Sequence, residues 1–212
     1  MSWHGIAAGR LPPAAPGRRI ALQGGSFNPP HRAHLAVART ALARLGVDEV
    51  WWLVSPANPL KRAADLAPFD ERLAAARALA AAEPRIVVTG FEAARRLTYT
   101  IDTARFVHRA RPGVRFVFLM GADNLAGLHR WRDWRALARL MPIAIVDRPG
   151  ASFAAMSAPA AIAFSRHRLP ERLAGALADR PPPAWVFLHA PRDPISSTEL
   201  RRAAKDRARQ PD

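Results

Sequence analysis

Residues 19–34 read RIALQGGSFNPPHRAH, and this stretch decides the fold of the chain. Residues 20–23 form an apolar run typical of a short strand, and residues 33–45 have the pattern of a helix. Between them, Gly24 and Gly25 let backbone N–H groups approach a ligand closely, because glycine has no side chain. Two prolines then end the turn and preset the backbone for entry into the helix.

Two histidines follow the prolines. His31 and His34 are three residues apart on the first helical turn, so their side chains share one face. The free N–H groups and the dipole of a helix N-terminus attract anions, and two imidazoles beside them suit a polyphosphate. Spacing alone leaves open a metal site or a pair of surface residues. A metal needs a third ligand, and no nearby His or carboxylate offers an obvious one, so we expect no protein-bound metal.

Short apolar runs alternate with helical patterns along the rest of the chain, and Pro and Gly fall between them. Strands of nearly continuous Val, Ile, Leu and Phe indicate an α/β protein with a mostly parallel sheet of about six strands and helices on both faces. We expect strands at residues 20–23, 50–55, 86–89, 114–120, 143–147 and 185–189. We expect helices at residues 33–45, 70–82, 100–110, 134–140, 170–178 and 198–207, and a loop with a short helix within 150–168.

The length of 212 residues suits one substantial domain. We expect this domain to span residues 19–204, after a flexible N-terminal extension over residues 1–18 and before a frayed tail over residues 205–212. In parallel sheets of this kind, ligands bind beyond the carboxyl ends of the strands at a topological switch point. The glycine and histidine stretch follows the first strand, at such an end.

The composition is strongly basic, with a net charge of +15 that is nearly all arginine, since only Lys61 and Lys205 are lysine. A GC-rich genome would explain this bias, and so would attraction of anionic ligands. The absence of cysteine excludes disulfides, zinc–thiolate sites and thiol catalysis. No apolar run approaches the roughly 18 to 20 residues of a membrane span, and no signal peptide is recognisable. We therefore expect a cytoplasmic protein without a membrane partner.

A second motif, ISSTELR, lies at residues 195–201. Ser196 and Glu199 have the spacing of a capping box at the start of the last helix. The three successive hydroxyls that begin at Ser196 also suit an anion, together with the free N–H groups of the helix. Arg201, one turn later, adds a guanidinium fork that matches a phosphate.

Together, the two motifs resemble the HxxH and ISSTxxR signatures of the nucleotidyltransferase superfamily, and in particular those of the bacterial nicotinate-nucleotide adenylyltransferases. Further similarity runs in order through about residues 19–204, at residues 56–61, 98–103, 121–124 and 148–150 and at Trp131 and Trp134. The resemblance implies a Rossmann-like, doubly wound fold. It also implies transfer of AMP from ATP to nicotinate mononucleotide with Mg²⁺, giving deamido-NAD and pyrophosphate in NAD biosynthesis.

The resemblance also implies roles for individual residues. His31, His34 and Arg201 correspond to catalytic residues at the ATP phosphates. The residues implied to bind ATP are Gly24, Gly25, Ser26, Phe27, Lys61, Ser196, Ser197 and Thr198, and those implied to bind the nicotinate nucleotide are Thr100, Asp123 and Trp131. Leu97 stands where a proline often precedes Thr-Tyr-Thr, and Arg132 stands where relatives can carry an aromatic residue; both positions concern the pyridine pocket.

The chemistry of this reaction agrees with the residues present. The attacking group is a phosphate monoester with a second pKa of about 6, so it is mostly dianionic at neutral pH and needs no general base. Bringing an anion to a polyanion instead requires positive groups that align the in-line attack. We expect His31, His34, Lys61 and Arg201 to supply them, without a covalent intermediate.

Several alternatives stay open at this point. The acceptor could be nicotinamide mononucleotide or phosphopantetheine, and the group transferred could be a cytidylyl group. A nucleic-acid-binding protein would show a basic stripe interleaved with aromatics, whereas these arginines are spread along the chain. Arg72 suits the surface or a ligand, and Trp131 suits packing or stacking on a ring. We expect the strand aromatics to be core residues: Trp51, Trp52, Phe116 and Phe118.

Overall fold

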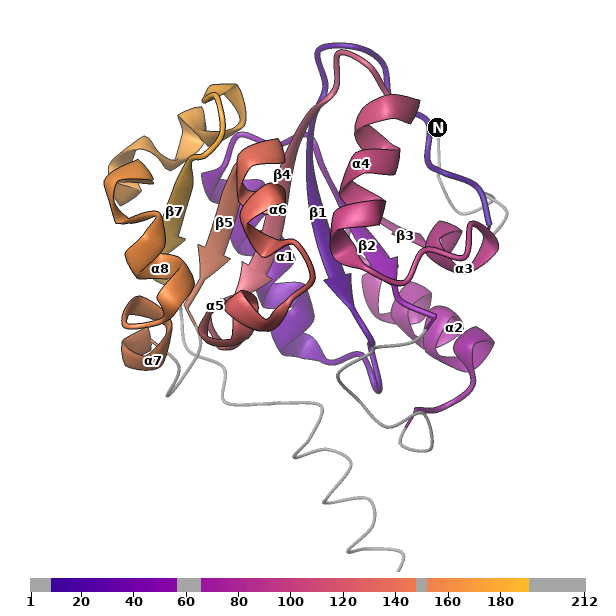
Figure 1. Ribbon diagram of the computed structural model, residues 1–212. Coiled ribbons are helices and arrows are strands. Elements are labelled where there is room, and N and C mark those ends of the chain that lie inside the picture. The colour runs from indigo at the N-terminus through magenta and orange to yellow at the C-terminus, as the bar shows by residue number, and fades with distance from the viewer. Residues whose placement is uncertain (1–8, 57–65, 148–151, 191–212) are drawn as a thin grey trace, which may run out of the picture.

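Within the described residues, seven strands form one sheet in the order β3-β2-β1-β4-β5-β7-β6, and every neighbouring pair is parallel (Figure 1). The structure is a computed structural model that describes residues 9–56, 66–147 and 152–190. The α/β prediction is confirmed, and the extra strand is β6, which has only two residues. The strands are β1 (Arg19–Gly25), β2 (Glu49–Val54), β3 (Ile86–Thr89), β4 (Arg115–Gly121), β5 (Ile143–Val146), β6 (Arg168–Leu169) and β7 (Trp185–Leu188).

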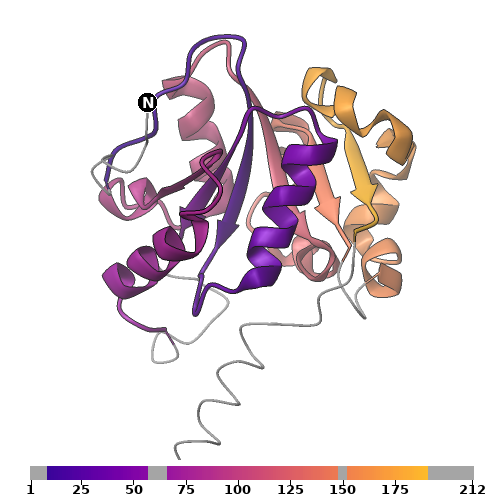
Figure 2. The ribbon, with the colours of Figure 1, turned by 180° about the vertical axis from the view of Figure 1, so that it is seen from behind.

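Helices cover both faces of the sheet, as the apolar strands require. One face packs against α3 (Phe91–Ala94), α4 (Thr100–Ala110), α5 (Ala122–Gly127), α6 (Trp134–Leu140) and α8 (Pro159–Ala163), which lie in front in Figure 1. The other face packs against α1 (Arg32–Arg44), α2 (Phe69–Ala80) and the 3-10 helix η5 (Glu171–Asp179), and Figure 2 shows α1 crossing it.

Successive side chains along each strand point to opposite faces of the sheet, which divides the interior into two apolar cores. Trp51 belongs to the core under α4, whereas its neighbour Trp52 belongs to the core under α1. Both indoles are fully buried, and Phe116 and Phe118 are 2% and 3% exposed. The prediction that these four aromatics are core residues is confirmed.

The predicted helices 100–110 and 134–140 agree with α4 and α6 at both ends. Two short helices, α3 and α5, were not expected, because four to six residues are too few to show a helical period. Residues 150–168 hold α7 (Ser152–Met156) and α8 rather than one short helix. The helix expected at residues 198–207 lies outside the described residues.

The direction in which successive strands are added to the sheet reverses at β1. It leaves β1 for β2 and β3 on one side, and then returns to add β4, β5 and β7 on the other. The carboxyl ends of β1 and β4 therefore flank the switch point, where open α/β sheets bind their ligands. The predicted phosphate stretch begins at the end of β1.

Residues 9–18 lie against the domain. The Arg111 guanidinium donates hydrogen bonds to the carbonyl oxygens of Leu11 and Pro12, and the Thr89 hydroxyl donates to that of Arg10. That residues 1–18 form a flexible extension stays a prediction. In the part of the chain that the structure describes, no helix is long and apolar enough to cross a membrane.

Candidate functional site

The turn after β1 is held in one shape by Phe27. This residue has a φ of +46° and a fully buried ring, which lies 4.7 Å from the His34 ring and 5.0 Å from the Trp52 ring between centroids. A Cβ atom at Gly25 would come within 3.1 Å of the Phe27 ring, so a side chain at this position requires the buried ring to shift by a few tenths of an ångström.

Gly24 has a different environment. It is exposed, its φ is not positive, and the nearest atom to a Cβ built there is Cζ of Phe118 at 3.9 Å, an ordinary contact. The described protein therefore has room for a side chain at this position. An open backbone at the carboxyl end of β1 is what a closely approaching ligand requires.

His31 and His34 lie together at the start of α1, as the sequence predicts. His31 is the N-cap residue, and its backbone N–H donates to Nδ1 of His34 at 3.2 Å. The ring centroids are 3.9 Å apart, and His31 is 6% exposed. Because Nδ1 of His34 accepts a hydrogen bond, the neutral ring carries its proton on Nε2, which is a donor suited to an anion.

Buried polar groups fix this helix start to the sheet. The Trp52 indole Nε1–H donates to Oε1 of Gln23 at 2.9 Å, and the Gln23 amide donates to the His34 carbonyl oxygen at 3.3 Å. Gln23 is 5% exposed. The pair therefore holds the first turn of α1 against β1.

Ser26 supplies a hydroxyl without a partner. Its Oγ atom is buried and has no hydrogen-bond partner among the described residues, although the residue is only 8% exposed. Buried polar atoms are almost always satisfied by protein, water or ligand. The Oγ atom stands in the predicted phosphate turn, so a bound anion or its water would satisfy it.

Arg72 on α2 is neither a surface residue nor open to a ligand. It is 2% exposed, and its guanidinium donates to the carbonyl oxygens of Ser26 (2.6 Å), Ser55 (2.8 Å), Pro56 (3.1 Å) and Ala67 (2.9 Å). Burial lowers the pKa of this guanidinium from its ordinary value. Sequence reasoning missed this role, although Arg72 shares the apolar helix face of Leu73, Ala76 and Ala80.

Of the residues predicted for the pyridine ring, Trp131 packs against β4, the strand paired with β1. Phe118 of β4 is 3.9 Å from the Cβ position of Gly24 and makes an edge-on contact with Trp131 at 6.0 Å between centroids. Arg132 lies 4.6 Å above the ring of Tyr99, which is the N-cap residue of α4. The structure therefore brings the segment of Trp131 to the start of α4, where Thr100 is the first helical residue.

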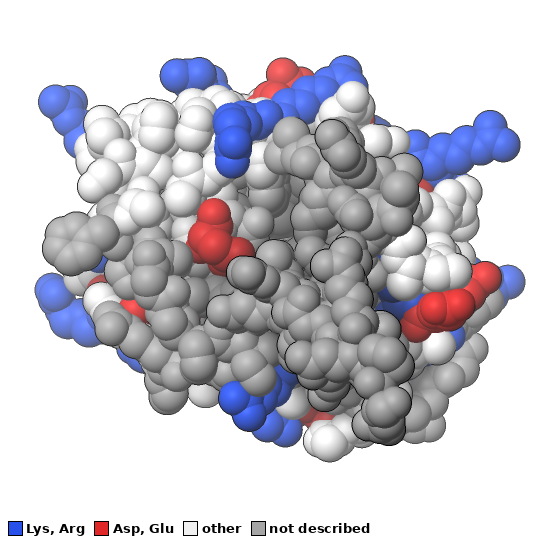
Figure 3. All heavy atoms as spheres, turned by 90° about the horizontal axis from the view of Figure 1, so that it is seen from below, with Lys and Arg blue, Asp and Glu red and all other residues white. Residues whose placement is uncertain are grey.

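Asp123 follows β4 directly. It is exposed in the first turn of α5, at the carboxyl edge of the strand that neighbours β1. Figure 3 views this side of the molecule, toward which the strand arrows point in Figure 1, and arginine side chains stand around its rim. The edge is thus polar and offers cations to an anionic ligand.

Part of the predicted site cannot be placed. Lys61, Ser196, Ser197, Thr198 and Arg201 lie outside the described residues. Among the residues that are described, no group of three or more His, Cys, Asp or Glu could hold a metal ion. The donors at the turn are N–H groups, imidazoles and a hydroxyl, which suit phosphate oxygens better than a bare cation.

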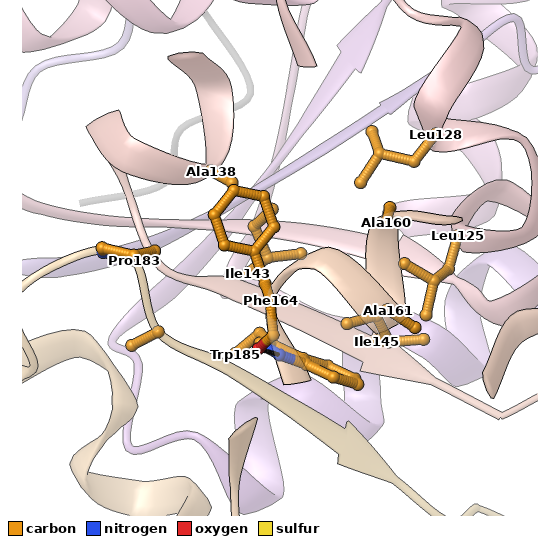
Figure 4. A pocket seen from close by; sticks show the side chains of 11 residues that line it. Leu125, Leu128, Ala138, Ile143, Ile145, Ala160, Ala161, Phe164, Pro183 and Trp185 are labelled. Carbon is orange, nitrogen blue, oxygen red and sulfur yellow. Dashed lines mark hydrogen bonds between the residues drawn. The ribbon is translucent and has the colours of Figure 1, made fainter. Parts of the chain in front are cut away.

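A small cavity of about 20 Å³ is lined by residues of β5, β7, α5 and α8 (Figure 4). Its lining is apolar and includes Ile143 and Trp185, which are the first residues of β5 and β7. The Trp185 indole donates to the Phe164 carbonyl oxygen at 2.7 Å, which satisfies the main polar group there. This chemistry does not suit a phosphate.

Known proteins share much of this sequence. The sequence matches the cytidylyltransferase-like family over residues 22–203. It is 57% identical over 183 residues to a probable nicotinate-nucleotide adenylyltransferase of Methylorubrum extorquens, covering 86% of this chain and 98% of that protein. It is 50% identical over 189 residues to the probable nicotinate-nucleotide adenylyltransferase of Brucella abortus, covering 89% of this chain and 97% of that protein.

Solved structures show the same fold. The nicotinic acid mononucleotide adenylyltransferase of Plasmodium falciparum, in complex with NaAD, superimposes with a TM-score of 0.64 at 19% identity, covering 87% of this chain and 83% of that one. The same enzyme in complex with APC gives a TM-score of 0.62. At this identity the similarity concerns the fold alone.

Proposed function

The chain belongs to the cytidylyltransferase-like family and, within it, to the nicotinate-nucleotide adenylyltransferases, and from this membership we propose its reaction. It transfers AMP from ATP to nicotinate mononucleotide and releases deamido-NAD and pyrophosphate. The observation that carries the proposal is the position of Phe118 on β4, the strand paired with β1: its ring packs edge-on against Trp131, and its Cζ atom lies 3.9 Å from where a Cβ of Gly24 would stand. An anion site and an aromatic ring site therefore share one strand.

The proposed chemistry is a direct in-line displacement. A phosphate oxygen of nicotinate mononucleotide attacks the α-phosphorus of ATP, and the bond from that phosphorus to the bridging oxygen breaks, so pyrophosphate leaves. The acceptor is already a dianion at neutral pH, so no group needs to remove a proton. Catalysis then depends on holding and neutralising the phosphates in line.

We assign the phosphates to the turn and the helix start. Nε2 of His34, the Ser26 hydroxyl and the backbone N–H groups of the turn donate to them, together with His31. By resemblance, the assignment also includes Lys61, Ser196, Ser197, Thr198 and Arg201. Their positively charged and hydroxyl groups would hold the phosphates from the other side.

We assign the nicotinate ring to Trp131, with Thr100 and Asp123 nearby. Trp131 is partly exposed and packs edge-on against Phe118, and we assign the stacking contact to its exposed surface. Arg132, at the position where relatives can carry an aromatic residue, lies next to this pocket over Tyr99. A guanidinium there would favour a carboxylate over an amide on the pyridine ring.

Mg²⁺ belongs to the proposal as a companion of ATP. Magnesium is usually bound through substrate phosphates and only one or two carboxylates, and Asp123 is the described carboxylate at this edge that fits such a role. Bound in this way, Mg²⁺ would neutralise phosphate charge. The cytoplasm, where ATP is available, is the proposed location.

The test is pyrophosphate release from ATP and Mg²⁺ with separate acceptors. Nicotinate mononucleotide should support turnover, with deamido-NAD as the product identified by mass spectrometry. Turnover only with nicotinamide mononucleotide or phosphopantetheine would refute the pyridine assignment and leave the phosphate site. Absence of release with every acceptor would refute the reaction.

A further inference from the structure

Arg72 is the least exposed charged side chain among the described residues, at 2%, and the proposed reaction gives it no contact with substrate. Its guanidinium makes four hydrogen bonds, and all four acceptors are backbone carbonyl oxygens. It makes no ion pair with a carboxylate in the described part of the chain, and desolvation is the cause that shifts its pKa.

The four carbonyls come from separate segments of the chain. Ser26 belongs to the turn after β1, Ser55 and Pro56 follow β2, and Ala67 precedes α2. A second contact joins the same segments, because the Ala67 N–H donates to Oδ1 of Asn28 at 3.1 Å. The phosphate turn is thus held from behind by groups that are distant in sequence.

Burying a cation without an ion pair costs desolvation free energy. Replacing such a cation by an apolar side chain of similar volume is often neutral or stabilising. What a guanidinium adds is geometry, since its donors form a rigid planar fork that fixes several acceptors at once. A lysine ammonium has three donors at one point and cannot reach four carbonyls spread over three segments.

We propose that Arg72 is a positioning residue for the transfer reaction, fixing the Ser26 carbonyl and thereby the phosphate turn relative to the end of β2. The inference rests on the proposed function. Because the peptide unit is planar and trans, holding the Ser26 carbonyl toward Arg72 directs the N–H of Phe27 to the opposite side. Arg72 therefore orients a backbone donor that the phosphates use, without touching the phosphates.

The consequence is a specific kinetic pattern. Donors displaced by about 1 Å reduce the rate of an oriented reaction by up to roughly 100-fold. The pyridine pocket is assigned to Thr100, Trp131 and their neighbours, which belong to the face of the sheet opposite to α2. Loss of Arg72 should therefore lower kcat and weaken ATP binding, while the KM for nicotinate mononucleotide changes little.

The experiment compares Arg72→Met with Leu73→Ala in the full-length protein. Leu73 is the next residue of α2 and is 3% exposed; it has no hydrogen-bonding group to hold the turn, and its truncation should weaken the helix packing. For both variants we would measure kcat, the KM for each substrate, the dissociation constant of ATP by calorimetry, and Tm. Arg72→Met should lose about tenfold or more in kcat at a temperature where it is fully folded, whereas Leu73→Ala should stay within about twofold.

Arg72→Lys serves as the second variant if Arg72→Met does not fold, since it retains the charge. It should fold and still lose kcat, because charge alone does not restore the four-carbonyl geometry. Wild-type kcat in Arg72→Met or Arg72→Lys would overturn the proposal, and so would an equal loss in Leu73→Ala at a similar Tm. Failure of the proposed function is a separate result, because the wild-type protein would then make no deamido-NAD.

Discussion

Gly24 and Gly25 are adjacent, but packing within the protein disfavours a side chain at only one of them. A Cβ atom at Gly25 would lie 3.1 Å from the ring of Phe27, the residue that packs against His34, and would require that ring to shift. A side chain at Gly24 would meet nothing closer than 3.9 Å in the described protein. Packing within the described protein therefore does not account for glycine at residue 24, and the proposed ligand site does.

Gly24→Ala should have a free energy of unfolding within about 1 kcal/mol of wild type. Ala reduces the conformational entropy of the unfolded chain, and its methyl group meets no clash in the folded state. Its apparent affinity for ATP should fall at least tenfold because the methyl group occupies the approach of the phosphates. Gly25→Ala is the matched control and should lower Tm by displacing Phe27. Unchanged ATP affinity in Gly24→Ala would contradict this assignment.

His31→Ala and His34→Ala should each lower kcat by about 100-fold or more, as expected for donors to developing phosphate charge. Stability should fall by only about 1 kcal/mol, the typical contribution of one hydrogen bond at a helix start. Steady-state kinetics and thermal unfolding of each single variant would check both parts. Full activity in both would exclude the histidines from the reaction.

At the scale of elements, α3 and α4 are joined by a buried carboxyl group. The Thr103 hydroxyl of α4 donates to Oε1 of Glu92 on α3 at 2.6 Å, and burial raises the pKa of Glu92. Leu97 between these helices also donates its N–H to the Glu92 carbonyl oxygen at 2.9 Å. The pair fixes the connection that leads to Thr100 and the pyridine pocket.

Glu92→Gln should raise the free energy of unfolding at neutral pH by about 1 kcal/mol, because the amide keeps the hydrogen bond without a buried charge. The sign follows from the raised pKa: the folded state favours the protonated carboxyl, so wild type loses stability as the pH rises through that pKa. The advantage of the variant should therefore vanish near pH 4. Urea unfolding at both pH values would check this, with Thr103→Val as a destabilising control.

At the scale of the whole molecule, the pH dependence of stability has a further contribution from His108. Its ring packs edge-on against Phe116 of β4 at 5.7 Å, and burial lowers its pKa. Its Nε2 has no hydrogen-bond partner in the described residues. The folded state therefore keeps this ring neutral, whereas the unfolded chain protonates it below about pH 6.5.

Stability should consequently fall as the pH drops below about 6.5, because the unfolded state then binds the extra proton. The slope from this single site is at most about 1.4 kcal/mol per pH unit. His108→Gln should flatten the dependence while the other histidines still titrate. Subtracting the two unfolding curves isolates the contribution, and identical slopes would show that His108 titrates normally when folded.

Local sequence determined much of this protein. The β1 turn, the start of α1 and the alternation of strands and helices depend on glycine, proline and apolar spacing over a few residues, so they could be predicted from residues 19–34 and from the later runs. The two helices that agree at both ends, α4 and α6, have their own apolar faces. The family was predictable by resemblance because the motifs keep their order along the chain.

Only the tertiary structure decided which side chains support the site. Arg72 lies 46 residues after Ser26, and Trp52 lies 29 residues after Gln23, so no local pattern indicates either hydrogen bond. The two-residue β6 and the six-residue α5 have too little sequence to show a period, and they form because the packed sheet provides their partners. Contacts between residues far apart in the sequence form only once the chain has folded, and such contacts position the turn after β1.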